Sequence, residues 1–179
     1  MSTIILKKPS KPLHWLQLYA LYRTAFPASE RKPFQMIRKM ARLGKTDLWY
    51  IEKDGTFAGL AFTINGPDLI LLDYLAISKK VRGQGVGSAA LAQLMKLYEG
   101  KGFFLEIEST LEDAPNQAER EKRKSFYQHC GLQELHVLVK LFGVNMELLG
   151  CRCQLTFEQY QSFYRDNYSP WAAEHIERI

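Results

Sequence analysis

The spacing of apolar residues changes along the chain, and the change predicts which segments are helices and which are strands. After Pro12 and again after Pro33, apolar residues recur three and four positions apart, which predicts helices ending near Phe26 and Gly44. Shorter apolar and β-branched runs then predict extended structure. The strands expected in this first half are residues 3–7, 48–51, 57–64 and 69–77.

The second half continues the alternation of helix and strand. Helical spacing predicts helices over residues 88–99 and 119–130 and a last helix after the capping box formed by Thr156 and Gln159. The remaining strands are expected at residues 103–108, 132–142 and 144–153, the last two as a hairpin around Gly143. The connection from strand 69–77 to strand 103–108 is long enough for a right-handed crossover, which makes these two strands parallel and the sheet mixed.

Composition limits the classes of protein that this chain can represent. Its 179 residues favour one domain, and 46% hydrophobic with 24% charged residues excludes disorder, collagen and coiled coil. The net charge of +5 is compatible with an anionic partner, although a solubility charge alone would explain it. Three cysteines form neither a disulfide nor a zinc framework, and no signal peptide or membrane-length run is visible, so we expect a cytoplasmic protein without a metal site.

The most informative segment is the glycine-rich stretch Val81-Arg82-Gly83-Gln84-Gly85-Val86-Gly87-Ser88, which joins a buried strand to a helix. Glycines let backbone N–H groups approach an anion closely, and the following helix N-terminus adds a positive dipole end. Lys79, Lys80 and Arg82 add positive charge. A plain glycine turn is the simpler alternative, but the strand, the helix and the cations together favour a phosphate-binding loop.

Two other phosphate-binding motifs compete for this segment. The P-loop pattern GxxxxGK[ST] is absent, whereas Gly85, Gly87 and Ala90 fit the dinucleotide pattern G-x-G-x-x-G/A, with Glu106 about 20 residues further on. Against a dinucleotide fold, the glycines are too far from the end of the strand, about 75 residues precede the motif, and too little chain follows Glu108.

The motif Arg82-Gly83-Gln84-Gly85-Val86-Gly87 resembles the R/Q-x-x-G-x-G/A signature of the GNAT superfamily of acetyl-CoA-dependent N-acetyltransferases. Leu75-Ala76-Ile77 resembles that family's cofactor strand, and Phe126-Tyr127 before Gly131 resembles its late helix, with Leu132 in place of the usual Phe. The element order is similar along almost the whole chain. The resemblance implies one domain over residues 1–179 with a mixed α+β fold: a mostly antiparallel sheet of about six to seven strands, a central parallel βαβ unit and flanking helices.

The resemblance also implies how the co-substrate acetyl-CoA binds. The pyrophosphate would lie on the loop residues, and the amides of the pantetheine arm would pair with the exposed backbone of the preceding strand. The residues implied for the loop are Arg82, Gly83, Gln84, Gly85, Val86, Gly87 and Ser88, and those for the strand are Leu75, Ala76 and Ile77.

Two residues are implied to be catalytic. Tyr127 matches the family's tyrosine and is the candidate general acid for the departing thiolate, because a phenol of ordinary pKa about 10 can donate a proton. Glu106 matches a strand glutamate that serves as base in some members. Asp73 and Glu108 are the candidate substrate-binding residues, which with Glu106 would suit a cationic amine. Each residue also has a plainer interpretation, as packing for Tyr127 and as an exposed or ion-paired carboxylate for the others.

The sequence therefore predicts transfer of an acetyl group from acetyl-CoA to a primary amine of a small molecule or peptide, by direct attack in a ternary complex. The alternatives are a non-catalytic acyl-CoA-binding or regulatory module and an NAD(P)-binding oxidoreductase. A nucleic-acid partner is not expected, because the basic run from Arg120 to Lys124 lacks interleaved aromatic residues. No membrane partner is expected. Similar proteins are often homodimers, but no segment reads as an interface, and the acceptor amine and acyl chain are not specified.

Overall fold

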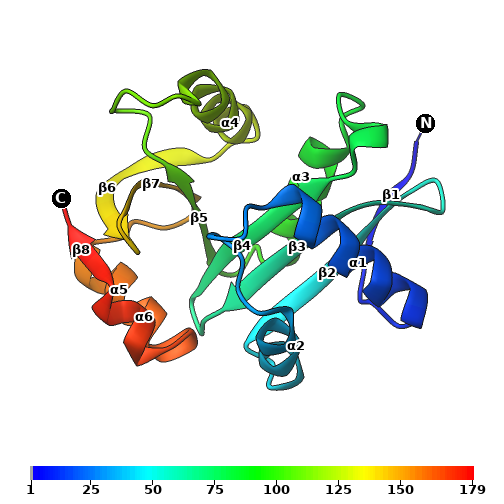
Figure 1. The fold of residues 1–179 in the computed structure, drawn as a ribbon, viewed down its shortest axis with the longest axis horizontal. Helices are drawn as coiled ribbons and strands as arrows, with labels where there is room; N and C mark the ends of the chain where they lie inside the picture. The colour runs from blue at the N-terminus through cyan, green and yellow to red at the C-terminus, as the bar shows by residue number, and fades with distance from the viewer. Residues whose placement is uncertain (1) are drawn as a thin grey trace. The chain divides into compact units, whose positions relative to one another are not determined.

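The computed structural model describes residues 2–179, which divide into two compact units. The first unit comprises the chain up to Asn65 together with Leu72–Leu97, and the second comprises Gly66–Leu71 and Tyr98–Ile179. Figure 1 shows the elements of both units, coloured from blue at the N-terminus to red at the C-terminus. Each unit is described by itself below.

The first unit is built on strands β1 to β4, which neighbour one another in sequence order. Strand β1 pairs antiparallel with β2, and β2 with β3. The elements of this unit are β1 (Ile4–Lys7), α1 (Pro12–Ala25), α2 (Phe34–Arg42), β2 (Thr46–Lys53), β3 (Thr56–Asn65), β4 (Leu69–Ile77) from Leu72 onward, the 3-10 turn η1 (Lys79–Val81) and α3 (Val86–Leu97).

Local sequence accounts for the boundaries in this unit. Asp54 and Gly55 both have positive φ, 50° and 78°, which is the conformation of a two-residue turn that matches the twist of an antiparallel pair. Pro12 occupies the first turn of α1, where its missing N–H costs nothing. Alternate residues of the strands, such as Leu60, Phe62 and Tyr74, pack with Leu18 and Tyr22 of α1, so one face of these strands is covered by helix.

The second unit contains the remaining strands in the order β5-β7-β6-β8, with all three neighbouring pairs antiparallel. Within this unit, the N–H of Gly102 at the start of β5 donates to the Asp68 carbonyl oxygen at 2.9 Å. The elements of this unit are β5 (Gly102–Glu108), α4 (Gln117–His129), β6 (Gln133–Leu141), β7 (Val144–Cys151), α5 (Phe157–Asn167), α6 (Pro170–Glu174) and β8 (Ile176–Arg178).

The predicted fold class is confirmed, with eight strands instead of six to seven. The extra strand is β8, whose three residues are too few to show a period of two. Strand 69–77 has the predicted bounds, whereas α3 begins at Val86 instead of Ser88. Strand β7 ends at Cys151 because Arg152 adopts a positive φ of 57°. Within residues 2–179, no helix reaches the length and apolarity that crossing a bilayer requires.

Candidate functional site

The glycine-rich loop connects β4 to α3 in the first unit, and its backbone shape depends on two glycines. Gly83 and Gly85 both have φ of +75°, a conformation that costs most other residues energy. The space around each is open, with no atom within 4 Å of where a Cβ would stand. Both residues are exposed. The loop therefore presents backbone, with no side chain on its glycines, to whatever approaches it.

Helix α3 starts directly after this loop and leaves its first N–H groups without intrahelical partners. The N–H of Ala89 donates to the Gly85 carbonyl oxygen at 3.0 Å, which closes the first turn. The N–H groups of Val86, Gly87 and Ser88 precede this bond and belong to the unpaired N-terminal set of a helix. Val86 is buried and anchors the turn, whereas Ser88 is exposed. The positive end of the helix dipole therefore opens at the loop.

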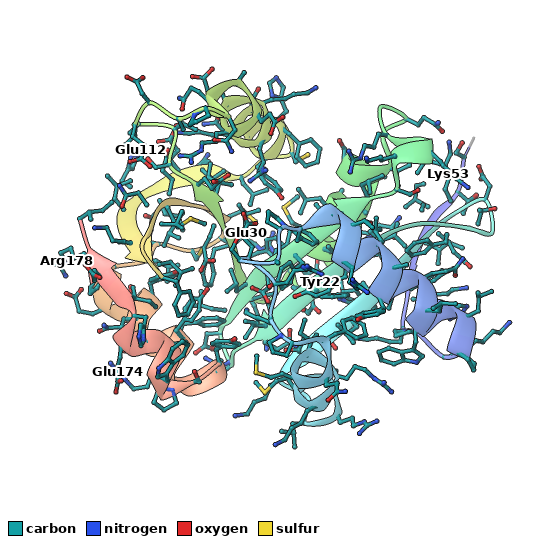
Figure 2. All side chains as sticks on the ribbon, viewed as in Figure 1. Tyr22, Glu30, Lys53, Glu112, Glu174 and Arg178 are labelled. Carbon is teal, nitrogen blue, oxygen red and sulfur yellow. The ribbon has the colours of Figure 1, made fainter. Side chains whose placement is uncertain are left out.

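Cationic side chains lie along the same loop. Lys79, Lys80 and Arg82 are exposed, and the Arg82 Nε donates to the carbonyl oxygen of Ile77 at 3.0 Å, which ties the loop to the end of β4. Lys53, labelled in Figure 2 at the β2–β3 turn, donates to the Gln84 side chain. Bare backbone, a helix N-terminus and four cations together form a site for a multiply charged anion such as a pyrophosphate.

The end of β4 lies tightly against β3. Leu75 and Ile77 are half-buried and Ala76 is buried, as expected for a strand with one covered face. A Cβ on Gly59 of β3 would stand 2.5 Å from the Ala76 carbonyl oxygen, so only glycine fits there. The N–H of Ser78 donates to the Ala58 carbonyl oxygen at 2.8 Å. Strand β3 thus constrains the backbone at Ala76 and Ile77, two of the three residues predicted to hold pantetheine.

Asp73 faces a cation from the α1–α2 connection. The Lys32 ammonium contacts both carboxylate oxygens of Asp73, at 2.8 and 2.7 Å. Tyr74, the next residue, donates its hydroxyl to the Glu30 carbonyl oxygen at 2.8 Å and accepts from the Lys32 N–H at 3.3 Å. Burial strongly raises the pKa of Tyr74. The substrate-binding role of Asp73 stays a prediction, and its charge is already matched within the chain.

Glu106, on β5 in the second unit, receives two tyrosine hydroxyls from α5. The hydroxyls of Tyr160 and Tyr164 donate to the same oxygen, Oε1, at 2.5 and 2.6 Å. The two tyrosines are 0% and 2% exposed, whereas Glu106 is half-buried. The pattern of Phe157, Tyr160 and Tyr164 predicts packing only, and it gives no indication that two of the hydroxyls meet a carboxylate of β5.

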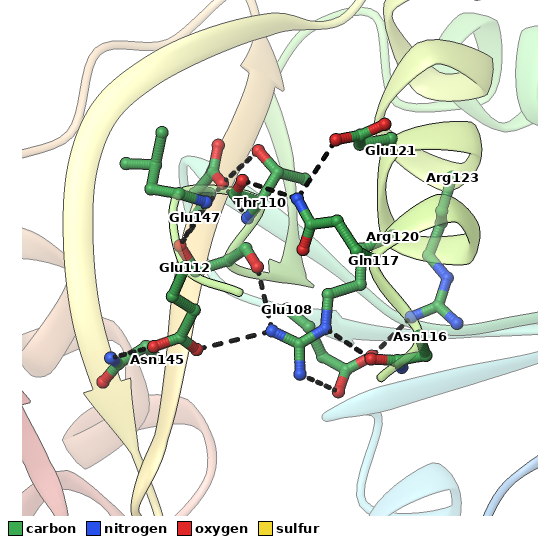
Figure 3. Close-up of polar contacts among 12 residues, drawn as sticks. Glu108, Thr110, Glu112, Asn116, Gln117, Arg120, Glu121, Arg123, Asn145 and Glu147 are labelled. Carbon is green, nitrogen blue, oxygen red and sulfur yellow. Dashed lines mark hydrogen bonds and ion pairs between the residues drawn. The ribbon is translucent and has the colours of Figure 1, made fainter. Parts of the chain in front are cut away.

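Glu108, two residues further along β5, belongs to a network with α4 (Figure 3). Its carboxylate contacts Arg120 at 3.1 Å and Arg123 at 3.5 Å, and Asn116 donates to it at 3.3 Å. Arg120 also contacts Glu112 at 3.4 Å. The ion-paired interpretation of Glu108 therefore describes this structure, and its substrate-binding role stays a prediction. Because Arg120 and Arg123 together match the charges of Glu108 and Glu112, the network offers little uncompensated negative charge to a ligand.

A second, more buried ion pair joins α4 to β7. Glu147 is 4% exposed and accepts hydrogen bonds from Lys124 Nζ at 2.5 Å and from the N–H and hydroxyl of Thr110 at 2.5 and 2.7 Å. Burial acts to raise the pKa of Glu147, but the hydrogen bonds from Lys124 and Thr110 outweigh burial, so the pKa is lowered. Burial likewise acts to lower the pKa of Lys124, and the bonds to Glu147 and Glu134 raise it overall. The pair holds α4 against β7.

Tyr127 lies one turn beyond Arg123 on α4 and is half-buried. Its ring packs against Phe126 with the centroids 5.2 Å apart. Burial raises the pKa of Tyr127 to about 12, and the charge of Arg123 opposes the rise only in part. The hydroxyl is therefore protonated at neutral pH, which is the form that a proton donor requires.

The structure gathers the predicted loop and strand residues in the first unit and the predicted catalytic pair, with Glu108, in the second. Sequence reasoning did not identify Lys32, Arg120, Tyr160 and Tyr164 as partners of the predicted carboxylates. The alternation of β5 and the spacing of α5 could indicate which residues share a face, but not which side chains meet. Among residues 2–179, no group of three or more His, Cys, Asp or Glu is arranged to hold a metal ion.

Comparisons with known proteins agree with this geometry. The sequence profile of the Acetyltransferase (GNAT) family matches residues 15–132. A protein of Bacillus subtilis (strain 168) named as an acetyltransferase, YjbC, is 31% identical over 116 residues, which are 65% of this chain and 55% of that protein. The chain thus spans only about half the length of this curated relative.

Solved structures show the same fold. A GNAT-family structure from Bacteroides thetaiotaomicron superposes with a TM-score of 0.76 at 18% identity, covering 96% of this chain and 98% of that one. A Bacillus subtilis acetyltransferase solved in complex with CoA gives a TM-score of 0.60 at 14% identity, covering 87% of this chain and all of that one. Taken with the family profile, which matches well over half of the residues, these likenesses show that the chain belongs to the GNAT acetyltransferase family.

Proposed function

We propose that this protein transfers an acetyl group from acetyl-CoA to a primary amine of a small molecule or peptide, with residues 1–179 working as a single N-acetyltransferase domain. The observation that carries the proposal is the loop from Arg82 to Ser88. Its two positive-φ glycines, the unpaired N–H groups that open α3 and the surrounding cations suit a pyrophosphate. Family membership and the CoA complex of the related fold support the choice of acetyl-CoA over other phosphorylated ligands.

The reaction needs one bond to form, one to break and two protons to move. The neutral amine nitrogen attacks the thioester carbonyl carbon, the new C–N bond forms, and the C–S bond breaks. In our proposal Glu106 takes the proton from the amine and Tyr127 gives its proton to the departing thiolate. Burial raises the pKa of Tyr127 to about 12, so the hydroxyl still carries its proton at neutral pH when the thiolate begins to leave.

The sequence suggests a cationic acceptor because it offers several carboxylates. The structure weakens this argument, because two of these carboxylates already have cationic partners. Asp73 is paired with Lys32, and Glu108 with Arg120 and Arg123. Glu106 accepts hydrogen bonds from the hydroxyls of Tyr160 and Tyr164. We place the acceptor amine at Glu106 because it is the proposed base, which must lie beside the amine to take its proton. A reducing, cytoplasmic setting fits the three cysteines, none of which forms a disulfide.

Calorimetric titration with acetyl-CoA, desulfo-CoA and NADPH tests the loop. We expect micromolar binding of both CoA ligands and no binding of NADPH. Binding of NADPH alone would instead identify a dinucleotide site at Gly85 and Gly87. Absence of binding to all three ligands would rule out a working phosphate loop.

Turnover tests the enzyme directly. Release of free CoA thiol is measured with spermidine, kanamycin and a peptide with a free N-terminus as acceptors. Tyr127→Phe removes only the hydroxyl, and we expect kcat to fall by about 100-fold while acetyl-CoA binding is retained. A parent protein that binds acetyl-CoA but acetylates none of these amines would favour the non-catalytic acyl-CoA-binding module.

A further inference from the structure

Helix α5 lies outside residues 15–132, the part that the family profile matches. Its start is fixed by a capping box, in which the Gln159 N–H donates to the Thr156 hydroxyl at 3.2 Å and the Thr156 N–H donates to the Gln159 side chain at 2.9 Å. Tyr160 and Tyr164 follow one helical turn apart and therefore share a face. The helix thus presents two phenol groups in a defined geometry.

Aromatic packing, in addition to hydrogen bonding, holds these two rings in place. Phe104 of β5 meets the Tyr160 ring edge-on with centroids 6.2 Å apart, and the two tyrosine rings lie 5.2 Å from each other. Phe104 and Glu106 lie on the same face of β5, because side chains alternate along a strand. Helix α5 therefore covers the face of β5 that carries the proposed base.

Both hydroxyls converge on one oxygen of Glu106, and this convergence is more specific than packing requires. The terminal torsion of a glutamate is broad when nothing holds it. Two hydroxyl donors at 2.5 and 2.6 Å fix the plane of the carboxylate, and each bond to a charged acceptor is stronger than a neutral one. Because the tyrosines are buried, water cannot easily replace these donors.

We infer that Tyr160 and Tyr164 are positioning residues that orient the Glu106 carboxylate for the acceptor amine, so that helix α5 completes the catalytic apparatus of this chain. The inference rests on the proposed function. It assigns no proton transfer to the tyrosines, whose hydroxyls stay hydrogen-bonded to Glu106 Oε1 throughout.

The inference predicts a change in pH dependence as well as in rate. Hydrogen bonds donated to a carboxylate favour its charged form, so a variant lacking one donor should protonate Glu106 at higher pH. The titratable and charged groups near Glu106 include the two tyrosines of α5 and, two residues along β5, Glu108, which is paired with Arg120 and Arg123 of α4. None of the cations is changed by a tyrosine substitution.

The test compares Tyr160→Phe, Tyr164→Phe and the double variant with the parent protein. We expect kcat to fall by about 10-fold for each change and about 100-fold for both, with the KM for acetyl-CoA unchanged. The acidic limb of the kcat/KM profile should move to higher pH in every variant. Tyr50→Phe is the matched control, since this buried tyrosine also donates to a side-chain oxygen at 2.6 Å, that of Gln17, and belongs to the first unit, whereas the proposed catalytic residues belong to the second. Its kcat and pH profile should equal those of the parent.

The same changes in a Glu106→Gln background show whether the tyrosines act through Glu106. In that background Tyr160→Phe and Tyr164→Phe should lower kcat by less than about twofold further. If the tyrosine substitutions lower kcat in the Glu106→Gln background as much as they do in the parent, the inference is overturned. An unshifted pH profile of kcat/KM in the single variants would overturn it as well. Either result would leave the proposed acetyltransferase activity intact. A parent that binds acetyl-CoA and turns over no amine would overturn the proposed function and the inference with it.

Discussion

Gly59→Ala places one methyl group behind the strand that is predicted to hold pantetheine. The new Cβ would stand 2.5 Å from the Ala76 carbonyl oxygen, 3.0 Å from the Ile77 Cδ1 and 3.3 Å from the Ile77 Cα. Two of these atoms are backbone and cannot rotate away. To restore ordinary contact distances, the Ala76 carbonyl must move by about 0.5–0.9 Å relative to β3. The substitution therefore shifts β4 where Leu75, Ala76 and Ile77 present their backbone.

Overpacking of this kind costs about 1–3 kcal/mol of unfolding free energy. A loss of about 1.4 kcal/mol in binding corresponds to tenfold in Kd, and we expect acetyl-CoA to bind at least about tenfold more weakly to Gly59→Ala. Urea unfolding measures the stability, and calorimetric titration with acetyl-CoA at a temperature where the variant is folded measures the affinity.

Gly100→Ala is the control, because Gly100 has no atom within 4 Å of its would-be Cβ and no positive φ. It should change neither quantity beyond the general effect of glycine replacement. Unchanged stability in Gly59→Ala would refute the close approach of β3 and β4. Reduced stability with the parent Kd would refute the role of the β4 backbone in binding acetyl-CoA.

Two further substitutions test the loop and the buried ion pair. Gly85→Ala forces a side chain into φ +75° and should cost about 1–2 kcal/mol and weaken acetyl-CoA binding, as calorimetry would show, whereas equal affinity would mean that this conformation is not needed. Lys124→Met leaves Glu147 buried without its cation and should cost about 3 kcal/mol in urea unfolding at pH 7. Because the folded-state pKa of Glu147 lies below its ordinary value of 4.5, this cost should be complete above pH 4.5 and disappear as the pH falls through the lowered value. The exposed pair of Arg178 and Glu158 is the contrast. Arg178→Met should change the free energy of unfolding little, both at neutral and at acidic pH. A similar loss of stability in Lys124→Met and Arg178→Met would contradict the argument from burial.

The sequence alone determined the features that depend on neighbours along the chain. The apolar run of residues 69–77 predicts β4 with its bounds, because a strand with covered faces needs little else to be recognised. Glycines between a strand and a helix predict the positive-φ loop, since few other residues tolerate that backbone. The Thr156 and Gln159 pair predicts the start of α5 from a hydrogen-bond pattern that closes within four residues.

Which charges and hydroxyls meet depends on the packing of the folded chain. Asp73 and Lys32 are 41 residues apart, and Glu106 and Tyr164 are 58 apart. Periodicity fixes the face on which a side chain lies, but the partner on that face depends on how strands and helices pack, and this packing is set by the whole core. The same carboxylates that look alike in the sequence thus differ in the fold: Asp73 and Glu108 form ion pairs with Lys32 and Arg120, whereas Glu106 accepts hydrogen bonds from two buried phenols.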